Sequence, residues 1–248
     1  MNKLYKYIGL ILFIFAWAII IYGGFIDAFF VPGPIEVFLK IFEFFINGEI
    51  NLDIFMTVYR IAIAFIIAVC IAIPVGLVLG AYPKLFSSSE FLIDFLRSIP
   101  ASAIFPLFLL IFGVDDLSKI TAVAFFICLM VLFNTVQGVI KSKKARIEAA
   151  RLMGASDWQI FQKILFWESL PQIIIGLRTA VSFGLALIIL TEMFIGTNYG
   201  IGRRIIDFQY TYEIVSLYAA IFIAGIIGYL LNRIFVTLEH KIIHWIEY

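Results

Sequence analysis

The feature that most constrains this chain is a series of apolar runs, each about 20 residues long, the length of helix that crosses the roughly 30 Å of hydrocarbon in a bilayer. Hydrophobic residues make up 63% of the 248, and charged residues 14%. The runs do not alternate as membrane β-strands do, and in lipid each segment must satisfy its own backbone. The sequence therefore predicts an all-α polytopic membrane protein with six transmembrane helices, at about residues 8–26, 57–80, 88–112, 118–138, 172–195 and 214–236.

The lysines and arginines between the runs predict the orientation. The first run is too long for a signal peptide and no small-residue cleavage site follows it, so we expect a retained helix. With the N-terminus inside, ten basic residues fall in cytoplasmic segments: Lys3, Lys6, Lys84, Lys141, Lys143, Lys144, Arg146, Arg151, Lys163 and Lys241. Four fall outside: Lys40, Lys119, Arg203 and Arg204. This excess predicts that both termini are cytoplasmic.

Little in the chain suggests catalysis or metal binding. Cys70 and Cys128 each stand alone in an apolar run, so we expect inert thiols. His240 and His244 are four residues apart but lack the glutamate of an HExxH motif, so no metal is assigned. There is no Gly-rich phosphate loop ending in Gly-Lys-Ser/Thr, and the net charge of +1 comes without a basic stripe. We predict no enzymatic activity, no cofactor and no nucleic-acid binding in this chain.

The polar segment 141–171 is predicted to form two short helices joined by a turn. Residues 141–153 are rich in helix formers, and Gly154 stands where a helix-ending residue with positive φ is expected. Ser156 and Gln159 form a capping box at the start of a second helix, which puts Trp158, Phe161 and Leu165 on one stripe. Such a helix suits a groove in another protein or the headgroups of the bilayer, and the residues alone leave both open.

Two sets of residues in the chain resemble a known family. The first is a Glu-Ala-Ala triplet with a later Gly and a Leu-Pro pair: Glu148, Ala149, Ala150, Gly154, Leu170 and Pro171. It resembles the EAA loop of ABC importer permeases. The second is Leu96, Arg97, Ser98, Ile99 and Pro100 with Pro106, then Phe112 with Gly113, then Glu192 followed by Gly200, Ile201 and Gly202. It is similar to the nitrate/sulfonate/taurine branch of that family, and the similarity covers about residues 55–237.

The resemblance implies a fold, partners and a function. The whole chain, 1–248, would be one permease domain of the type I ABC importer fold, with a core at about 55–237 and a coupling loop at about 141–170. A second copy would complete the path, two cytoplasmic ATPase subunits would bind ATP and Mg, and an extracytoplasmic binding protein would deliver the solute. That solute would be a small anion such as nitrate, a sulfonate, taurine or bicarbonate, taken up across the plasma membrane of a prokaryote. The expected ATPase-coupling residues are Glu148, Ala149, Ala150, Gly154, Ala155, Ser156, Trp158, Phe161 and Pro171.

Ionisable residues inside the spans each require an explanation, because each costs at least about 2.5 kcal/mol at the bilayer centre. We expect Arg60 to snorkel to headgroups near the outer end of its span. Asp94 can pair with Arg97, and Pro100 and Pro106 are expected to break the third span twice. Either this is a kinked helix with an ion pair, or its polar residues face the translocation path. The residues assigned to the path are Arg97, Ser98, Pro100, Ser102, Arg178 and Glu192.

Three further expectations concern packing and the outer surface. Arg178 and Glu192 are too far apart to pair on one helix, so each needs a partner elsewhere. Gly184, with Ser182 and Ala186, offers a close-packing face for a dimer. Phe38, Ile41, Phe42 and Phe45 recur at helical spacing in the outer segment 27–53, so we expect part of it to lie along the outer interface, either as a structural collar or as a contact for an extracytoplasmic partner. The alternative function is a secondary transporter or channel that works without an ATPase. It would need mid-membrane carboxylates, for which Glu192 is the candidate in the later spans, and usually an internal repeat, which is not evident.

Overall fold

The computed structural model describes residues 5–27, 29–142 and 144–242, and everything it describes as regular structure is helical. The chain divides into two compact units: residues 1–56 with 198–227, and residues 57–197 with 228–248. The single domain predicted over 1–248 stays a prediction. His244 lies outside the described residues, and so does the side chain of His240.

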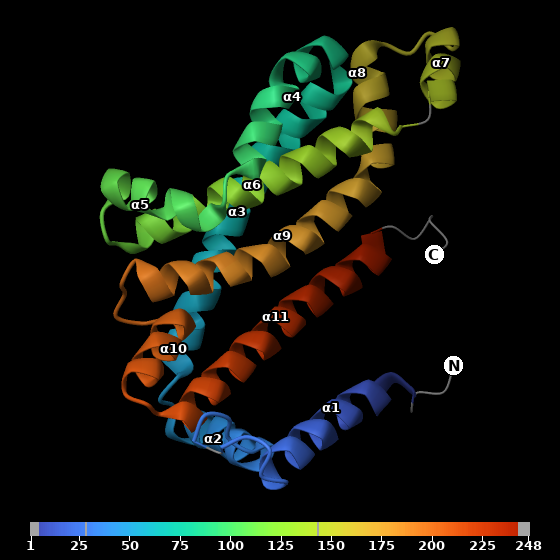
Figure 1. Cartoon of the computed structure of the whole chain (residues 1–248). Helices are drawn as coiled ribbons and strands as arrows, with labels where there is room; N and C mark the ends of the chain where they lie inside the picture. The colour runs from blue at the N-terminus through green and yellow to red at the C-terminus, as the bar shows by residue number, and fades with distance from the viewer. Residues whose placement is uncertain (1–4, 28, 143, 243–248) are drawn as a thin grey trace. The chain divides into compact units, whose positions relative to one another are not determined.

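The helices follow one another with short connections (Figure 1). They are α1 (Tyr5–Tyr22), α2 (Pro34–Asn47), α3 (Asn51–Ala81), α4 (Pro83–Ser98), α5 (Ala101–Phe112), α6 (Asp116–Ile140), α7 (Lys144–Leu152), α8 (Asp157–Ile160), the π-helical turn η1 (Phe161–Leu165), α9 (Phe166–Phe194), α10 (Ile201–Tyr210) and α11 (Ile214–Ile242). Helices α8, η1 and α9 run on as one helix, Asp157–Phe194, so the predicted second loop helix and the fifth span are a single element.

Among the described residues, four helices are long and apolar enough to cross a membrane: Asn51–Ala81, Asp116–Ile140, Asp157–Phe194 and Ile214–Glu239. The pair α4 and α5, bent by 94°, makes a fifth if it is counted as one span. The predicted count of six is not confirmed, because the first apolar helix, Ile8–Tyr22, is short. It ends where Gly23 and Gly24 follow, and Gly24 has a φ of 74° that an α-helix cannot accommodate.

The break between α4 and α5 lies where the sequence predicts it. Ile99 precedes a proline and is extended (φ −70°, ψ 126°), because the proline ring disfavours helical backbone at the residue before it. Pro100 then lies just before the first residue of α5. The second predicted break is wrong: Pro106 lies inside α5, which continues to Phe112.

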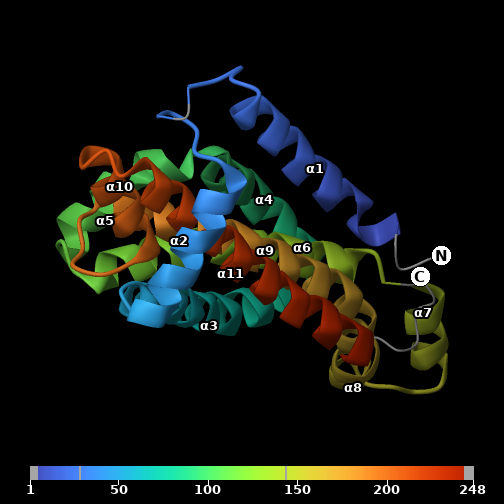
Figure 2. The ribbon, with the colours of Figure 1, turned by 90° about the horizontal axis from the view of Figure 1, so that it is seen from below.

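In the unit of residues 57–197 and 228–248, α6 packs along α9 (Figure 2), and glycines of both helices lie in tight contact there. A Cβ at Gly138 would lie 2.9 Å from the carbonyl oxygen of Ser169, and one at Gly176 would lie 2.6 Å from Cβ of Asn134. Small residues let membrane helices approach closely enough to gain dispersion energy. Gly184 belongs to this contact, because it faces Ile127, so the close packing predicted for it lies within the chain. Ser182 and Ala186 of the same predicted face are exposed, and the dimer contact stays a prediction.

The other unit is organised around Asp53, which is fully buried at the start of α3. Its carboxylate accepts hydrogen bonds from the backbone N–H of Gly200 (2.8 Å) and from Nε of Arg204 (2.7 Å), and so holds the first turn of α10. Helix α10 also stacks Phe208 on Phe44 of α2, with ring centroids 5.7 Å apart.

Most of the apolar stripe predicted for the outer segment is exposed on α2, and that this segment lies along the outer interface stays a prediction. Helix α2 buries Val37, Ile41 and Phe44, which lie at i, i+4 and i+7, and leaves Phe42 and Phe45 exposed. Both rows have helical spacing, so the sequence alone could not say which row packs inside and which faces outward.

Candidate functional site: an exposed loop and a buried ion-pair cluster

The turn that ends α7 is built as the sequence predicts. Gly154 has a φ of 81°, a left-handed conformation that glycine adopts without steric penalty. Its N–H donates to the carbonyl of Arg151 (3.0 Å), and the N–H of Ala155 donates to the carbonyl of Ala150 (3.0 Å). These are the two hydrogen bonds of a Schellman motif, which satisfies the free carbonyls at the helix end.

The start of α8 is fixed by the predicted capping box. The Ser156 hydroxyl accepts a hydrogen bond from the backbone N–H of Gln159 (3.3 Å), and the Gln159 side chain accepts one from the N–H of Ser156 (2.8 Å). Asp157 lies in the first turn, where its charge complements the helix dipole, and it pairs with Arg151 of α7 at 3.3 Å. The loop from α7 to α8 is therefore locally rigid.

This rigid loop exposes large apolar side chains. Leu152 is 90% exposed, Met153 81% and Trp158 64%. In Figures 1 and 2, α7 and α8 lie beyond the ends of α6 and α9, joined by this loop. Exposed apolar groups on a rigid polar loop are typical of a protein contact.

The predicted stripe on the second helix is divided between two environments. Trp158 points outward and stacks on Phe161 (5.7 Å, interplanar angle 11°). Phe161 and Leu165 are half-buried and pack against a buried cluster of Leu77, Val139 and Ile173. Two of the three stripe residues therefore attach the loop to the membrane helices, and only Trp158 is left exposed for contact with a partner.

An open cleft of about 830 Å³ lies beside the loop. Its walls come from the end of α3 and start of α4 (Val78 to Ser87), the end of α6 (Val139 to Ser142) and the loop elements α7, α8 and η1. An ion pair between Nη1 of Arg146 and Oε1 of Glu168, 2.6 Å apart, links α7 to α9.

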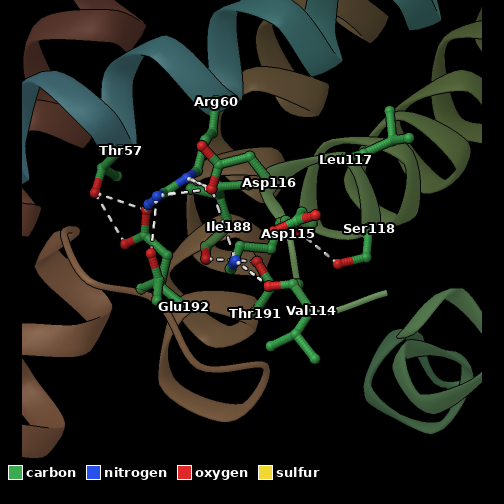
Figure 3. Close-up of polar contacts among 12 residues, drawn as sticks. Thr57, Arg60, Val114, Asp115, Asp116, Leu117, Ser118, Ile188, Thr191 and Glu192 are labelled. Atoms are coloured by element: carbon green, nitrogen blue, oxygen red, sulfur yellow. Dashed lines mark hydrogen bonds and ion pairs between the residues drawn. The ribbon is translucent and has the colours of Figure 1, made fainter. Parts of the chain in front are cut away.

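A second polar site, remote from the loop in sequence, joins α3, α6 and α9 (Figure 3). Arg60 donates from Nη1 to Oε1 of Glu192 (2.6 Å) and from Nε to Oδ1 of Asp116 (2.9 Å). The Thr57 hydroxyl lies 3.0 and 2.9 Å from the two carboxylate oxygens of Glu192. Arg60 is 1% exposed and Glu192 is fully buried. The prediction that Arg60 snorkels to headgroups is wrong, because the side chain turns inward to two carboxylates.

Lys119 completes this cluster. Its ammonium donates to the carbonyl of Val114 (3.3 Å) and lies 3.7 Å from Oδ1 of Asp116, and its side chain is 1% exposed. Arg60 and Lys119 balance Glu192 and Asp116, so the four charges sum to zero. Buried charges are tolerated when they are paired and hydrogen-bonded in this way. The cluster therefore fixes three helices to one another.

Comparison with known proteins identifies the family. Residues 72–244 match the family described as "Binding-protein-dependent transport system inner membrane component". The chain belongs to this family.

Relatives of the permease cover nearly its whole length. A protein of Brucella abortus (strain 2308), named as a probable ABC transporter permease protein, is 31% identical over 87% of this chain and 86% of its own. The bicarbonate transport system permease of Synechococcus elongatus is 29% identical over 95% and 87%. The taurine transport system permease of Escherichia coli (strain K12) is 27% identical over 89% and 82%.

The fold also matches a solved permease. The structure of the MetNI methionine ABC transporter in inward-facing conformation has a TM-score of 0.68 over 77% of this chain and 94% of the matched chain, at 18% identity. This likeness shows a type I ABC importer permease fold. The chain is thus a multi-pass membrane permease of a binding-protein-dependent ABC importer, as its sequence predicts.

Four of the permease's predicted path residues, Arg97, Ser98, Pro100 and Ser102, lie at or beside the break between α4 and α5. Arg97 lies over the ring of Phe133 (3.8 Å) and 3.3 Å from Asp94, which confirms the predicted pair. Ser98 is exposed at the break, and Ser102 lines a cavity of about 260 Å³ with Phe105 and Phe194.

Arg178 and Glu192 find separate partners, as predicted. Arg178 donates from Nε to Asn232 of α11 (2.9 Å) and lies 3.6 Å from Glu239, whereas Glu192 belongs to the Arg60 cluster. The path role of all six residues stays a prediction.

The structure groups most of the predicted coupling residues in the loop, together with two exposed apolar residues, Leu152 and Met153, that the sequence analysis did not single out. The coupling role of these residues stays a prediction. Glu148 and Ala149 are exposed on α7, Ala150 is buried, and Pro171 lies inside α9 rather than in the loop. Leu152 and Met153 were missed because they fall between the Glu-Ala-Ala triplet and Gly154, outside any helical stripe. Their position directly before a helix-ending glycine is the signal that could have found them.

Proposed function

We propose that the α7–α8 loop of this permease docks on a separate ATPase subunit that binds ATP and Mg. The exposure of Leu152, Met153 and Trp158 on a loop held by a capping box and a Schellman motif carries the proposal. A rigid apolar contact loses little conformational entropy on binding, so it suits transmission of force. Charged residues at its rim, Arg151 and Asp157 among them, add orientation.

The permease works as a pair in this proposal. The described residues of one copy supply four or five spans, and a second copy related by a two-fold axis along the membrane normal would complete a path between them. The basic residues favour cytoplasmic termini and a cytoplasmic α7–α8 loop in a prokaryotic plasma membrane, where two ATPase subunits would bind two such loops. When those subunits close on each other, the path would change from inward-facing to outward-facing.

The solute of the proposed importer is a small anion delivered by an extracytoplasmic binding protein. Relatives named for aliphatic sulfonates, taurine, nitrate and bicarbonate support this class. Arg97 and Arg178 are compatible with anion passage, since both side chains are partly exposed.

The alternative, transport without an ATPase, is disfavoured by the Glu192 site. A secondary transporter needs a carboxylate that can take up and release a coupling ion near mid-membrane. Glu192, its candidate in the later spans, is fully buried and bound to Arg60 and Thr57.

The proposal is tested by purification and by uptake. The chain, expressed in its native host, should co-purify with an ATP-hydrolysing subunit, and the purified complex with a binding protein should support ATP-dependent uptake in vesicles. Gly154→Val, which forces a β-branched residue into a left-handed conformation, and Glu148→Ala should each abolish uptake but not insertion. Glu90→Gln, at an exposed carboxylate on α4, is the control. Unchanged uptake in both loop variants, or uptake without ATP, would refute the proposal.

A further inference from the structure

The helix that leaves the exposed loop contains one irregular turn. In η1 the backbone N–H of Phe166 donates to the carbonyl of Phe161, five residues earlier, where an α-helix would use Gln162. The residues on both sides, Ile160 and Phe166, have ordinary helical angles. The five-residue spacing of this hydrogen bond means that the turn holds one extra residue in an otherwise continuous helix. Neither proline nor glycine falls within the turn, so neither residue is its cause.

The helix is firmly held on one side of this turn. Ser169 is fully buried and its backbone contacts Gly138, Gln172 donates to Oδ1 of Asn134 (3.1 Å), and Ile173 is 1% exposed. From Ser169 onward, α9 is therefore fixed to α6.

The helix borders an open cleft on the other side. Trp158 and Gln159 of α8 are exposed, whereas Ile160 is buried (4% exposed) and Phe161 and Leu165, within η1, pack against a buried cluster. Ile160, Phe161 and Leu165 also line the 830 Å³ cleft whose far wall belongs to α3 and α4. The π-helical turn thus lies at the boundary between a segment fixed along α6 and a segment that faces the cleft. Turns of this kind are a recognised cause of helix bending and recur at functional sites.

We propose that η1 is a joint about which α7 and α8 swing across the cleft while α9 beyond Ser169 stays fixed on α6. The inference rests on the proposed docking of an ATPase subunit on the α7–α8 loop. Ser156 lies five residues before η1, so the arm is about 8 Å long at 1.5 Å per residue. A bend of 20° would move its tip by about 3 Å, which the cleft can accommodate.

The ion pair between Arg146 and Glu168 bridges the joint and holds the observed position. Arg146 lies on α7, in the moving segment, and Glu168 lies on α9 directly after η1. The arginine side chain is 62% exposed and the Glu168 side chain 12%, so water can replace the arginine's contact when the loop moves, and the pair would have to open for the joint to bend.

Deletion of Gln162 tests the joint. Gln162 is exposed in the middle of η1, and removing it takes out the extra residue, so that a regular α-helix keeps the flanking faces in register. The matched control is Gln162→Ala, which keeps the residue count. In the complex with its ATPase subunits, the deletion should retain those subunits but lower ATP-dependent uptake by an order of magnitude or more, as loss of a hinge does. The alanine variant should transport normally. Equal uptake by the two variants would overturn the joint.

Hydrogen exchange on the unmodified complex provides a second measurement that needs no variant. Amides at residues 161–166 should exchange at least about tenfold faster than those at 173–188, and their rate should differ between nucleotide-free and ATP-bound complex. Uniform and nucleotide-independent exchange would refute the joint even if the deletion failed to insert. Failure of the proposed function is distinct, because the unmodified chain would then lack an ATPase partner altogether.

Discussion

Replacement of Arg60 by methionine should destabilise the fold strongly. Methionine fills much of the same volume but leaves the fully buried Glu192 carboxylate without its arginine, with the Thr57 hydroxyl still in contact. Breaking a buried ion pair by removing one partner costs about 3–5 kcal/mol. Glu192→Gln should cost less, about 1–3 kcal/mol, because its amide oxygen still accepts from Arg60 and Arg60 still has Asp116.

The two changes should be strongly coupled. In the double variant both buried charges of the pair are removed together. Its loss in the free energy of unfolding should therefore be about 2 kcal/mol smaller than the sum of the two single losses. At about 2–4 °C per kcal/mol for a chain of this size, Arg60→Met should lower the unfolding midpoint by about 6–20 °C. The assay is thermal unfolding of the purified chain in detergent, followed by tryptophan fluorescence.

An arginine in an exposed pair provides the control. Arg97 pairs with Asp94 at 3.3 Å and its side chain is 36% exposed, so Arg97→Met should cost less than about 1 kcal/mol. If Arg60→Met lowered the midpoint no more than Arg97→Met does, or if the double variant equalled the sum of the single ones, the buried cluster would not be holding the three helices together.

Three further predictions concern packing, backbone strain and docking. Gly176→Leu should lower the unfolding midpoint, with a loss of about 1–3 kcal/mol or more, because even its Cβ would lie 2.6 Å from Asn134; an unchanged midpoint would contradict the α6–α9 packing. Tyr212 has a φ of 58° at the end of α10, so Tyr212→Gly should raise stability by about 1 kcal/mol in the same assay, and a lowered midpoint would count against strain there. Met153→Glu should leave stability within about 0.5 kcal/mol but weaken ATPase association, measured by titration, by about tenfold or more; undiminished affinity would remove Met153 from the contact.

Local chemistry explains which parts of the structure the sequence predicts well. The turn at Gly154, the capping box of Ser156 and Gln159, and the break before Pro100 each depend on a few neighbouring residues. Their hydrogen bonds and steric limits act within one or two helical turns. The membrane spans are predicted for a similar reason, since an apolar run of sufficient length has few other stable forms in lipid.

The errors arise where distant residues decide the outcome. Arg60 pairs with Glu192 across 132 positions, and no periodicity in either segment indicates it. The buried row of α2 could not be identified from the sequence, because Phe44 packs on Phe208 of α10, far along the chain. Pro106 does not break its helix although proline usually does, and nothing in the structure explains why.

The most direct test of the central claim is photo-cross-linking from position 153. A photoreactive amino acid in place of Met153, in the assembled complex in native membranes, should form a covalent product with the ATP-hydrolysing subunit. The same amino acid at Phe91, an equally exposed apolar position on α4, should not. Cross-links from position 153 to lipid alone would contradict the account, because the loop would then rest on the bilayer instead of on the subunit that drives transport.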